Sequence, residues 1–266
     1  MSAVEVVGVE KIFNAGKASQ VDALVGIGLT VEPGEFVSLI GPSGCGKSTL
    51  LRLIGNLTEP SAGAITVNGK PARQSRLDQD YGMAFQQAGL FEWRSVAKNI
   101  ELPLELKGWD RGKRRARARD MLDLVKLPDF ADHMPWQLSG GMQQRVAIAR
   151  ALAAHPPLLL MDEPFGALDE MTREHMQAEL LRICAETGTT VIFVTHSIPE
   201  AVYLSTRVVV MSPRPGRITD VIDVPLGSDR SDGTRETAGF FEKITAVREA
   251  LRGAEIGTGT RGIEDR

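Results

Sequence analysis

The sequence is poor in cysteine, in aromatic side chains and in long apolar runs, and each scarcity excludes a class of protein. Cys45 and Cys184 are its two cysteines, too few for a disulfide framework, so we expect a reducing compartment. Runs such as LLLM (158–161) have the length of strands, far short of the ~20 apolar residues of a membrane-spanning helix. The first residues show no basic stretch followed by an apolar one, so we expect no secretory signal and a cytoplasmic location.

Charge of neither sign dominates, with 31 Lys+Arg against 34 Asp+Glu and a net charge of -3. The overall charge therefore favours neither nucleic acid nor anionic lipid as a partner. One basic segment, Arg111 to Arg119, allows two interpretations: a nucleic-acid patch, or the solvated face of a helix whose apolar side carries Met121, Leu122 and Val125. We favour the helix, because no aromatic residues interleave with the basic ones.

Three apolar runs, each followed by polar residues, predict the parallel sheet of an α/β core. They are FVSLI, LLLM and TVIFVT, which start at residues 36, 158 and 190. The first leads into a glycine-rich loop, the second into two carboxylates and the third into a histidine. Open α/β sheets bind ligands at the carboxyl ends of their strands, so these polar residues are candidates for a site.

The remaining segments predict an organisation around this core. The first third alternates strand-like runs with turns, and Asn68-Gly69 is a strong hairpin signal. VVVMSPRPGRITDVIDVPL predicts a strand, a turn and a returning strand. We expect one large domain at 1–228, with a core at 1–90 and 155–228 and a helical subdomain at 91–154, followed by a C-terminal helix and flexible tail at 229–266.

In the C-terminal helix, apolar residues at helical spacing predict a docking face: Phe240, Phe241, Ile244, Val247 and Leu251. The tail that we expect to be mobile begins at Gly253.

GPSGCGKST at 41–49, here named the phosphate loop, fits the pattern G-x-x-x-x-G-K-[ST] after a predicted strand. Its glycines allow backbone N–H groups to surround a β-phosphate, while Lys47 reaches the β- and γ-phosphates and Ser48 is a ligand for Mg²⁺. Thr49 lies near the α-phosphate, and Cys45 is tolerated for its small size. The nucleotide contacts that we expect are Gly41, Pro42, Ser43, Gly44, Cys45, Gly46, Lys47, Ser48 and Thr49.

Two acidic residues and one histidine are the candidates for catalysing hydrolysis. Asp162, at the end of a strand, is placed to hold the water shell of the metal, and Glu163 to polarise an attacking water. His196 is a candidate for contact with the γ-phosphate and for orienting that water.

Three further residues complete the predicted site. Gln86 is the candidate for completing the Mg²⁺ shell, with Gln87 as the neighbouring alternative. Phe13 is the aromatic residue placed to stack on adenine, unless it packs in the core.

LSGGMQQR at 138–145, here named the signature segment, predicts a second phosphate cradle. Ser139, Gly140 and Gly141 offer a hydroxyl and open backbone N–H groups where a helix begins, and unpaired donors together with the helix dipole favour anions there. A plain helix cap is the alternative, but it does not explain the Gln-Gln-Arg that follows.

In their order and spacing, these motifs, together with Ala167, Leu168 and Asp169, resemble an ABC-type ATP-binding cassette from residue 4 to about 225. The resemblance implies a P-loop NTPase core with an antiparallel β subdomain and an inserted helical subdomain, which hydrolyses ATP with Mg²⁺. It also implies a head-to-tail homodimer, in which Ser139 and Gly141 contact the nucleotide of the partner and Asp169 lies at the dimer seam.

WRSVAKNI, THSIPEAVYLSTRVVVMSPRPGRI and FFEKITAVREAL resemble the nitrate/sulfonate/taurine branch of importers. The chain departs from this branch at three positions: relatives often have Pro in place of Glu92, Asp in place of Ser197 and Tyr in place of Phe13. The resemblance implies permease subunits, an extracytoplasmic solute-binding protein, a place on the cytoplasmic face of the membrane and no nucleic acid. Phe91, Trp93 and Val96 are candidates for permease contact, with a core position as the alternative for Trp93.

Two other functions compete with transport. A soluble ABC-type ATPase that acts on nucleic acid or ribosomes usually shows a coiled-coil insertion, a zinc motif or two cassettes in one chain, and the sequence shows none of them. A P-loop kinase has no use for the signature segment.

Overall fold

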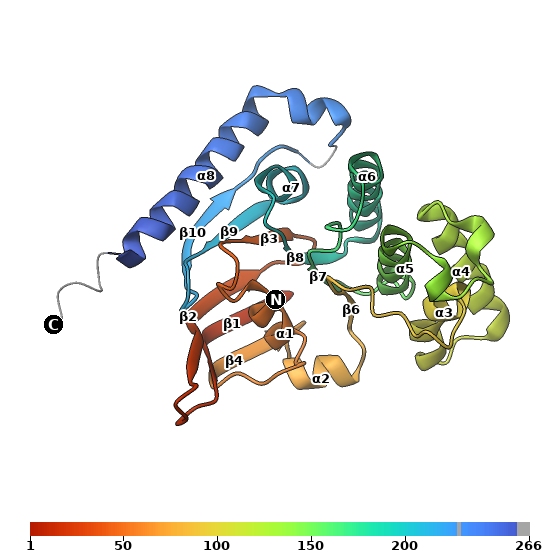
Figure 1. The fold of residues 1–266 in the computed structure, drawn as a ribbon, viewed down its shortest axis with the longest axis horizontal. Coiled ribbons are helices and arrows are strands. Elements are labelled where there is room, and N and C mark those ends of the chain that lie inside the picture. Colours follow the sequence, from red (N-terminus) through yellow and green to blue (C-terminus); the bar gives the residue numbers. More distant parts are fainter. Residues whose placement is uncertain (228–229, 260–266) are drawn as a thin grey trace. The chain divides into compact units, whose positions relative to one another are not determined.

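The computed structural model describes residues 1–227 and 230–259, which form two compact units (Figure 1). Unit 1 combines Met1–Gln79 with the described residues from Thr190 onward, and unit 2 is Asp80–Thr189. Within the described residues, no helix is both long enough and apolar enough to span a membrane.

An antiparallel sheet in unit 1 has the strand order β2-β1-β4-β5. The strands are β1 (Val4–Phe13), β2 (Val21–Val31), β4 (Ala62–Val67) and β5 (Lys70–Pro71). Asn68 and Gly69 connect β4 to β5 with φ angles of 51° and 74°. A two-residue hairpin turn of type I′ needs positive φ at both positions, and the predicted hairpin is confirmed.

The second sheet contributes the order β10-β9-β3-β8 to unit 1. Its strands here are β3 (Phe36–Ile40), β8 (Thr190–Val194), β9 (Arg207–Met211) and β10 (Ile218–Asp223). β3 pairs in parallel with β8 and β9, whereas β10 returns antiparallel to β9, as the sequence predicts. Every residue of β3 and β8 is buried, which explains why both strands are apolar apart from Ser38 and Thr190.

Helices of unit 1 follow these strands, and α8 packs against α7 and β9. They are α1 (Lys47–Ile54), α2 (Ala72–Leu77), α7 (Ile198–Leu204), the 3-10 helix η3 (Asp232–Glu236) and α8 (Ala238–Gly259). Phe240, Ile244 and Val247 of α8 are buried, which confirms that the helix docks.

The structure differs from the sequence expectation at two places in α8. Phe241 is 57% exposed and Leu251 is only partly buried, so neither belongs fully to the docking face. Phe241 follows Phe240 directly, and adjacent residues of a helix point about 100° apart. The helix also continues to Gly259, into the segment whose composition predicts mobility. Residues 260–266 of that tail lie outside the described residues.

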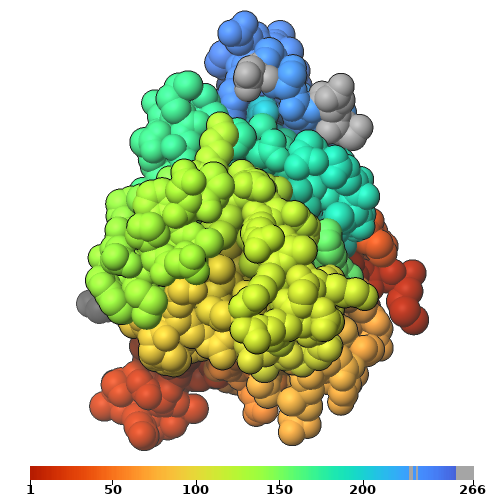
Figure 2. Space-filling view, turned by 90° about the vertical axis from the view of Figure 1, so that its right-hand side faces the viewer, coloured from red at the N-terminus to blue at the C-terminus, as the bar shows by residue number. Residues whose placement is uncertain are grey.

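Unit 2 contains the parallel pair β6 (Tyr81–Ala84) and β7 (Leu158–Asp162) with a group of helices. The helices are α3 (Val96–Leu106), α4 (Arg111–Leu124), η1 (Pro128–Phe130), η2 (Pro135–Gln137), α5 (Gly140–Leu152) and α6 (Glu170–Thr187). The surface of the segment that holds α3 to α5 faces the viewer in Figure 2, in yellow to green.

The basic segment of unit 2 is the face of an amphipathic helix. Met121 and Leu122 are buried on α4 and Val125 is buried at its C-cap, as the helical interpretation predicts. Arg117 on the same helix donates a hydrogen bond to the carbonyl oxygen of Ala153 at 3.0 Å. The side chain of Arg114 lies 3.9 Å from the carboxylate of Glu101. Two basic residues of this helix thus contact other parts of unit 2, while Arg111, Lys113, Arg115 and Arg119 are exposed.

Candidate functional site

The phosphate loop connects the end of β3 to the start of α1, in the predicted order of strand, loop and helix. Gly44 and Gly46 adopt φ angles of 75° and 107°, in the left-handed region that favours glycine. Cys45 between them is buried. This backbone is a concave loop of the kind that binds phosphate through N–H groups.

Lys47 places its ammonium group inside this loop. Its side chain is buried, and Nζ donates hydrogen bonds to the carbonyl oxygens of Gly41 at 2.7 Å and Pro42 at 3.0 Å. Two left-handed glycines and a buried positive charge in one loop fit the triphosphate of a nucleotide. A hydroxyl from Ser48 follows directly in α1.

Phe13 ends β1 and is 40% exposed, so its alternative interpretation as an ordinary core residue is wrong. The ammonium of Lys11 lies 5.1 Å from the centroid of its ring, within the range of a cation–π contact. The ring thus retains exposed aromatic surface of the kind on which an adenine base stacks.

His196 follows β8 on a backbone that is held on both sides. The hydroxyl of Thr195 donates to the carboxylate of Glu200 and accepts a hydrogen bond from the N–H of Ser197 at 3.0 Å. The hydroxyl of Ser197 in turn caps α7 by accepting from the N–H of Glu200 at 3.4 Å. Ser197 therefore supplies the side-chain oxygen that caps α7. The side chain of His196 itself is exposed.

The two carboxylates of unit 2 occupy different environments. Asp162 is the last residue of β7 and is buried, whereas Glu163 is partly exposed. Glu163 has a φ of 46°, a left-handed conformation that a residue with a side chain rarely adopts. Such backbone strain concentrates at functional sites, and it aims the carboxylate of Glu163 differently from a continued strand.

The segment 85–89, here named the glutamine loop, follows β6 and is fastened by side chains of α5. The amide of Gln144 donates to the carbonyl oxygen of Phe85 at 2.8 Å. The guanidinium of Arg150 donates to the carbonyl oxygens of Ala88 and Gly89, both at 2.9 Å. Gln86 and its alternative, Gln87, are both exposed on this loop.

The signature segment forms the start of α5. Ser139 is the N-cap, and its hydroxyl accepts from the N–H of Met142 at 3.3 Å. Ser139 and Gly140 are exposed, and a Cβ added at Gly140 would meet nothing within 4 Å. The first turn of α5 therefore offers N–H groups to an incoming anion without steric hindrance.

Gly141 and Asp169 belong to the same region of unit 2. A Cβ at Gly141 would lie 3.2 Å from the carbonyl oxygen of Ala167, so α5 and the segment before α6 pack closely. Asp169 caps α6 by accepting from the N–H of Thr172 at 2.9 Å, and this bond lowers the pKa of the Asp169 carboxyl; the charge of Arg145 adds a smaller effect.

The Gln-Gln-Arg of the signature segment has structural roles that the sequence does not reveal. Gln143 donates to the carbonyl oxygen of Pro135 at 2.9 Å, and Arg145 donates to that of Val125 at the same distance. With Gln144 bound to Phe85, three consecutive side chains fasten α5 to three other segments. These residues position the helix.

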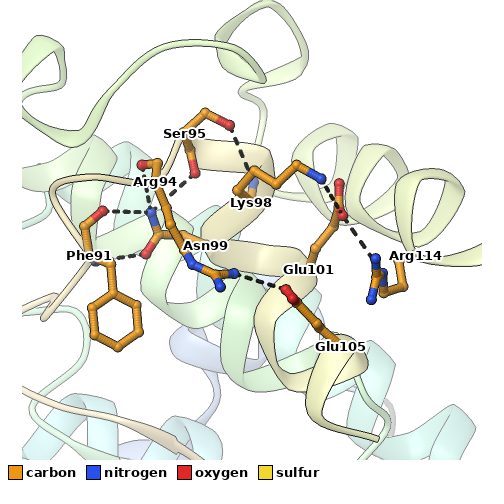
Figure 3. A network of polar contacts seen from close by, with 8 residues as sticks. All are labelled: Phe91, Arg94, Ser95, Lys98, Asn99, Glu101, Glu105 and Arg114. Carbon is orange, nitrogen blue, oxygen red and sulfur yellow. Dashed lines mark hydrogen bonds and ion pairs between the residues drawn. The ribbon is translucent and has the colours of Figure 1, made fainter. Parts of the chain in front are cut away.

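Asn99 organises the turn that precedes α3 (Figure 3). Its side chain is buried, accepts from the N–H of Phe91 at 2.8 Å, and donates to the carbonyl oxygens of Phe91, Arg94 and Ser95 at 3.0–3.1 Å. Neighbouring ion pairs join Arg94 to Glu105 and Lys98 to Glu101.

This turn displays an aromatic pair. The rings of Phe91 and Trp93 lie 4.9 Å apart, and Trp93 is 73% exposed, so a core position for Trp93 is excluded. Val96 is fully buried, and the expectation that it contacts a permease is wrong. It faces inward because it begins α3 on the apolar side of that helix.

Each unit carries oxygen donors of the kind that Mg²⁺ prefers: the hydroxyl of Ser48 in unit 1, and the amide of Gln86 and the carboxylate of Asp162 in unit 2. Within the described residues, no group of three His, Cys, Asp or Glu side chains is arranged to hold a metal by itself. A metal that also takes oxygen ligands from phosphate and water is compatible with such a sparse set.

Comparisons with known proteins agree with the motifs. The ABC transporter family matches residues 24–166, more than half of the chain. An uncharacterised ABC transporter ATP-binding protein of Methanocaldococcus jannaschii is 46% identical over 244 residues, which cover 92% of this chain and 90% of that protein. The taurine import ATP-binding protein TauB of Pelagibacter ubique is 44% identical over 240 residues, 90% of each chain.

A solved structure has the same fold. It is a dimeric ATP-binding cassette in a post-hydrolysis state, bound to ADP and phosphate, with a TM-score of 0.77 and 37% identity. The match covers 83% of this chain and 98% of that one.

Proposed function

Because the chain belongs to the ABC transporter family, as one of its ATP-binding proteins and ATPases, we propose that it drives the import of a small solute. The solute class is that of nitrate, sulfonates and taurine, which the similarity to taurine import proteins supports. In this proposal the chain works as a homodimer on the cytoplasmic face of a membrane. Permease subunits and an extracytoplasmic solute-binding protein complete the complex, and nucleic acid has no part in it.

In this proposal the phosphate loop binds the nucleotide. Lys47 exchanges the carbonyl oxygens of Gly41 and Pro42 for the β- and γ-phosphates, while N–H groups of the loop bind the β-phosphate. Phe13 stacks on the adenine. Ser48, Gln86 and Asp162 are the residues that would hold Mg²⁺, directly or through water, and the ion would supply positive charge to offset that of the phosphates.

In this proposal Glu163 and His196 catalyse the hydrolysis of ATP. Glu163 accepts a proton from the attacking water, and the left-handed backbone directs its carboxylate away from the course of β7. His196 orients the water and contacts the γ-phosphate. The hydrogen bonds of Thr195 and Ser197 keep the backbone of His196 in place during this step.

The exposed N-terminus of α5, at Ser139 and Gly140, is the observation that supports the composite site. Ser139 and Gly141 at this N-terminus bind the γ-phosphate held by the phosphate loop of a partner chain. A helix N-terminus contributes about 0.3–1 kcal/mol toward an exposed anion and ~2 kcal/mol toward a partly buried one. ATP therefore favours closure of the dimer and ADP does not, since ADP lacks the γ-phosphate.

A mixture of two inactive variants tests the composite site. Ser139→Arg blocks the signature segment, and Lys47→Ala disables the phosphate loop. In a mixed dimer, one of the two sites retains both intact halves, so ATPase activity returns to about half of the wild-type value per dimer. The control is each variant alone, and an inactive mixed dimer of verified composition would refute sharing of the site.

Uptake by the complete transporter tests the solute class. The chain is co-expressed with candidate permease and binding-protein subunits, in cells that lack their own uptake of these solutes, and uptake of labelled taurine, nitrate and an alkanesulfonate is measured separately. Glu163→Gln is the matched inactive control. Uptake of none of these solutes, in cells that contain the assembled complex, would refute the proposed class.

A further inference from the structure

The loop of residues 212–217 connects β9 to β10 in unit 1 and closes on itself. The buried hydroxyl of Ser212 accepts from the N–H of Arg217 at 3.0 Å and lies 3.2 Å from the carbonyl oxygen of Pro215. The backbone N–H of Ser212 also donates to the carbonyl oxygen of Arg217 at 2.9 Å. These bonds hold the ends of the loop together, so it presents a defined surface.

Gly216 of this loop lies between β2 and the phosphate loop. On one side its N–H donates to the carbonyl oxygen of Ala23 at 2.9 Å, and its carbonyl accepts from the N–H of Val25 at 3.1 Å. On the other side, a Cβ at Gly216 would lie 2.0 Å from the carbonyl oxygen of Cys45. Only a glycine at position 216 allows the backbone of this loop to come so close to the carbonyl of Cys45.

Arg214 contacts the neighbouring peptide of the phosphate loop. Its Nη2 atom donates to the carbonyl oxygen of Gly44 at 3.2 Å, while the side chain remains exposed. The loop thus touches two successive carbonyl groups, those of Gly44 and Cys45.

These carbonyls belong to the Gly44–Cys45 and Cys45–Gly46 peptides, whose N–H groups point away from the loop of residues 212–217. In a trans peptide the C=O and the following N–H are directed oppositely, so contact at the oxygen of Gly44 turns the N–H of Cys45 away from Arg214. That N–H donates to the carbonyl oxygen of Pro42, with an N···O distance of 3.3 Å, and the same oxygen also accepts from Lys47. The N–H of Cys45 therefore faces the same interior as the ammonium.

We propose that the loop of residues 212–217 is an outer brace of the phosphate loop, and that Arg214 and Gly216 are positioning residues for nucleotide. Arg214 orients the Gly44–Cys45 peptide and Gly216 the Cys45–Gly46 peptide, so that the two N–H groups face the phosphates. The inference rests on the proposed role of the phosphate loop. It adds to the phosphate loop two residues that lie more than 160 positions away in the sequence.

Two substitutions at Arg214 separate local positioning from general charge attraction. Arg214→Leu removes the hydrogen bond and the charge, and we expect the dissociation constant of MgATP to rise about fivefold, the effect of one hydrogen bond. Arg214→Lys restores a donor and the charge, so its affinity returns to within about twofold of the wild-type value. The fivefold difference persists in 0.5 M NaCl, where long-range attraction is screened.

Gly216→Ala tests the close approach directly. The added Cβ displaces the carbonyl of Cys45, and we expect at least a tenfold weaker affinity for MgATP, roughly the effect of misdirecting one charge-assisted N–H bond. The matched control is Gly28→Ala on β2, where an added Cβ would meet nothing within 4 Å.

Isothermal titration with MgATP, together with the melting temperature without nucleotide, gives the decisive readout. Support is a loss of affinity in Arg214→Leu at an unchanged nucleotide-free melting temperature, with rescue by Arg214→Lys. Wild-type affinity in Arg214→Leu, or a difference that disappears in high salt, overturns the inference. Wild-type affinity in a folded Gly216→Ala overturns it as well, and if that variant does not fold, the Arg214 pair decides.

Lys47→Ala, included as a reference, separates the two proposals. If Lys47→Ala also binds MgATP normally, the phosphate-loop assignment itself fails. If only Lys47→Ala loses affinity, the outer brace alone is refuted.

Discussion

Replacing Asn99 by alanine removes the polar centre of the turn before α3 (Figure 3). The amide accepts one hydrogen bond, from the N–H of Phe91, and its two hydrogens are shared among three carbonyl oxygens. Alanine leaves these backbone groups without their partner. We expect Asn99→Ala to destabilise the protein strongly and to release the turn that carries Trp93.

The magnitude follows from the number of bonds. One accepted and two donated hydrogen bonds, at ~1 kcal/mol each, contribute about 3 kcal/mol. Water replaces some of them in the variant, since Phe91 is only partly buried, whereas the small cavity left by the truncation adds to the loss. The free energy of unfolding should therefore fall by about 2–4 kcal/mol, and the melting temperature by about 5–10 °C.

Thermal and urea unfolding, followed by circular dichroism, measure this effect. The matched control is Arg94→Ala, which changes the same turn but removes only an ion pair with Glu105 at its surface. Exposed ion pairs contribute little, so we expect the melting temperature of Arg94→Ala to stay close to that of the wild type. Equal melting temperatures in Asn99→Ala and the wild type would show that the buried amide does not organise this turn.

Three further predictions concern single side chains. Glu163→Gln should bind ATP with wild-type affinity in isothermal titration and turn it over at least tenfold more slowly in a phosphate-release assay; unchanged turnover would remove Glu163 as the base. Burial raises the pKa of Cys184 to about 12, so iodoacetamide at pH 8 should label Cys184 far more slowly in the folded protein than in urea, and equal rates by mass spectrometry would contradict this. The lowered pKa of Asp169 means that its carboxylate stabilises the folded state above the unfolded pKa of about 4 and loses this effect as the pH falls through the folded pKa. The difference in urea stability between the wild type and Asp169→Ala should thus narrow between pH 7 and pH 3, and a constant difference would refute the role of the charge.

The sequence predicts the strands and motifs well because their signals are local. Continuous apolar runs predict β3, β7 and β8, since strands covered on both faces carry no polar alternation. The turn at Asn68-Gly69 is predictable because few residue pairs tolerate positive φ at both positions. The phosphate loop is predictable for the same reason, and its glycines at 44 and 46 are left-handed in the structure.

Burial at single positions is less predictable, because it depends on what packs against an element. Periodicity assigns Phe241 to the docking face of α8, but the neighbouring Phe240 takes the buried place. Val96 lies beside exposed aromatic residues in the sequence and is itself buried where α3 begins. A stretch of sequence shows that a turn carries apolar residues but not which of them face outward.

The side chains that hold the functional loops donate hydrogen bonds to loop carbonyls, a role that sequence motifs do not reveal. A loop that offers N–H groups to a ligand turns its carbonyl groups away from that ligand, and buried carbonyls need hydrogen-bond donors. Gln144 and Arg150 supply donors to the glutamine loop, Asn99 to the turn before α3, and Arg214 to the phosphate loop. Gln144, Arg150 and Arg214 lie on parts of the chain distant from the loops they bind, whereas Asn99 directly follows its turn. An N–H group that faces a ligand cannot at the same time donate to a carbonyl on the other side of its loop, so these carbonyls take donors from side chains. Long amide and guanidinium side chains are therefore expected wherever a phosphate-binding loop has an outer side, and only the folded backbone reveals which of them reach it.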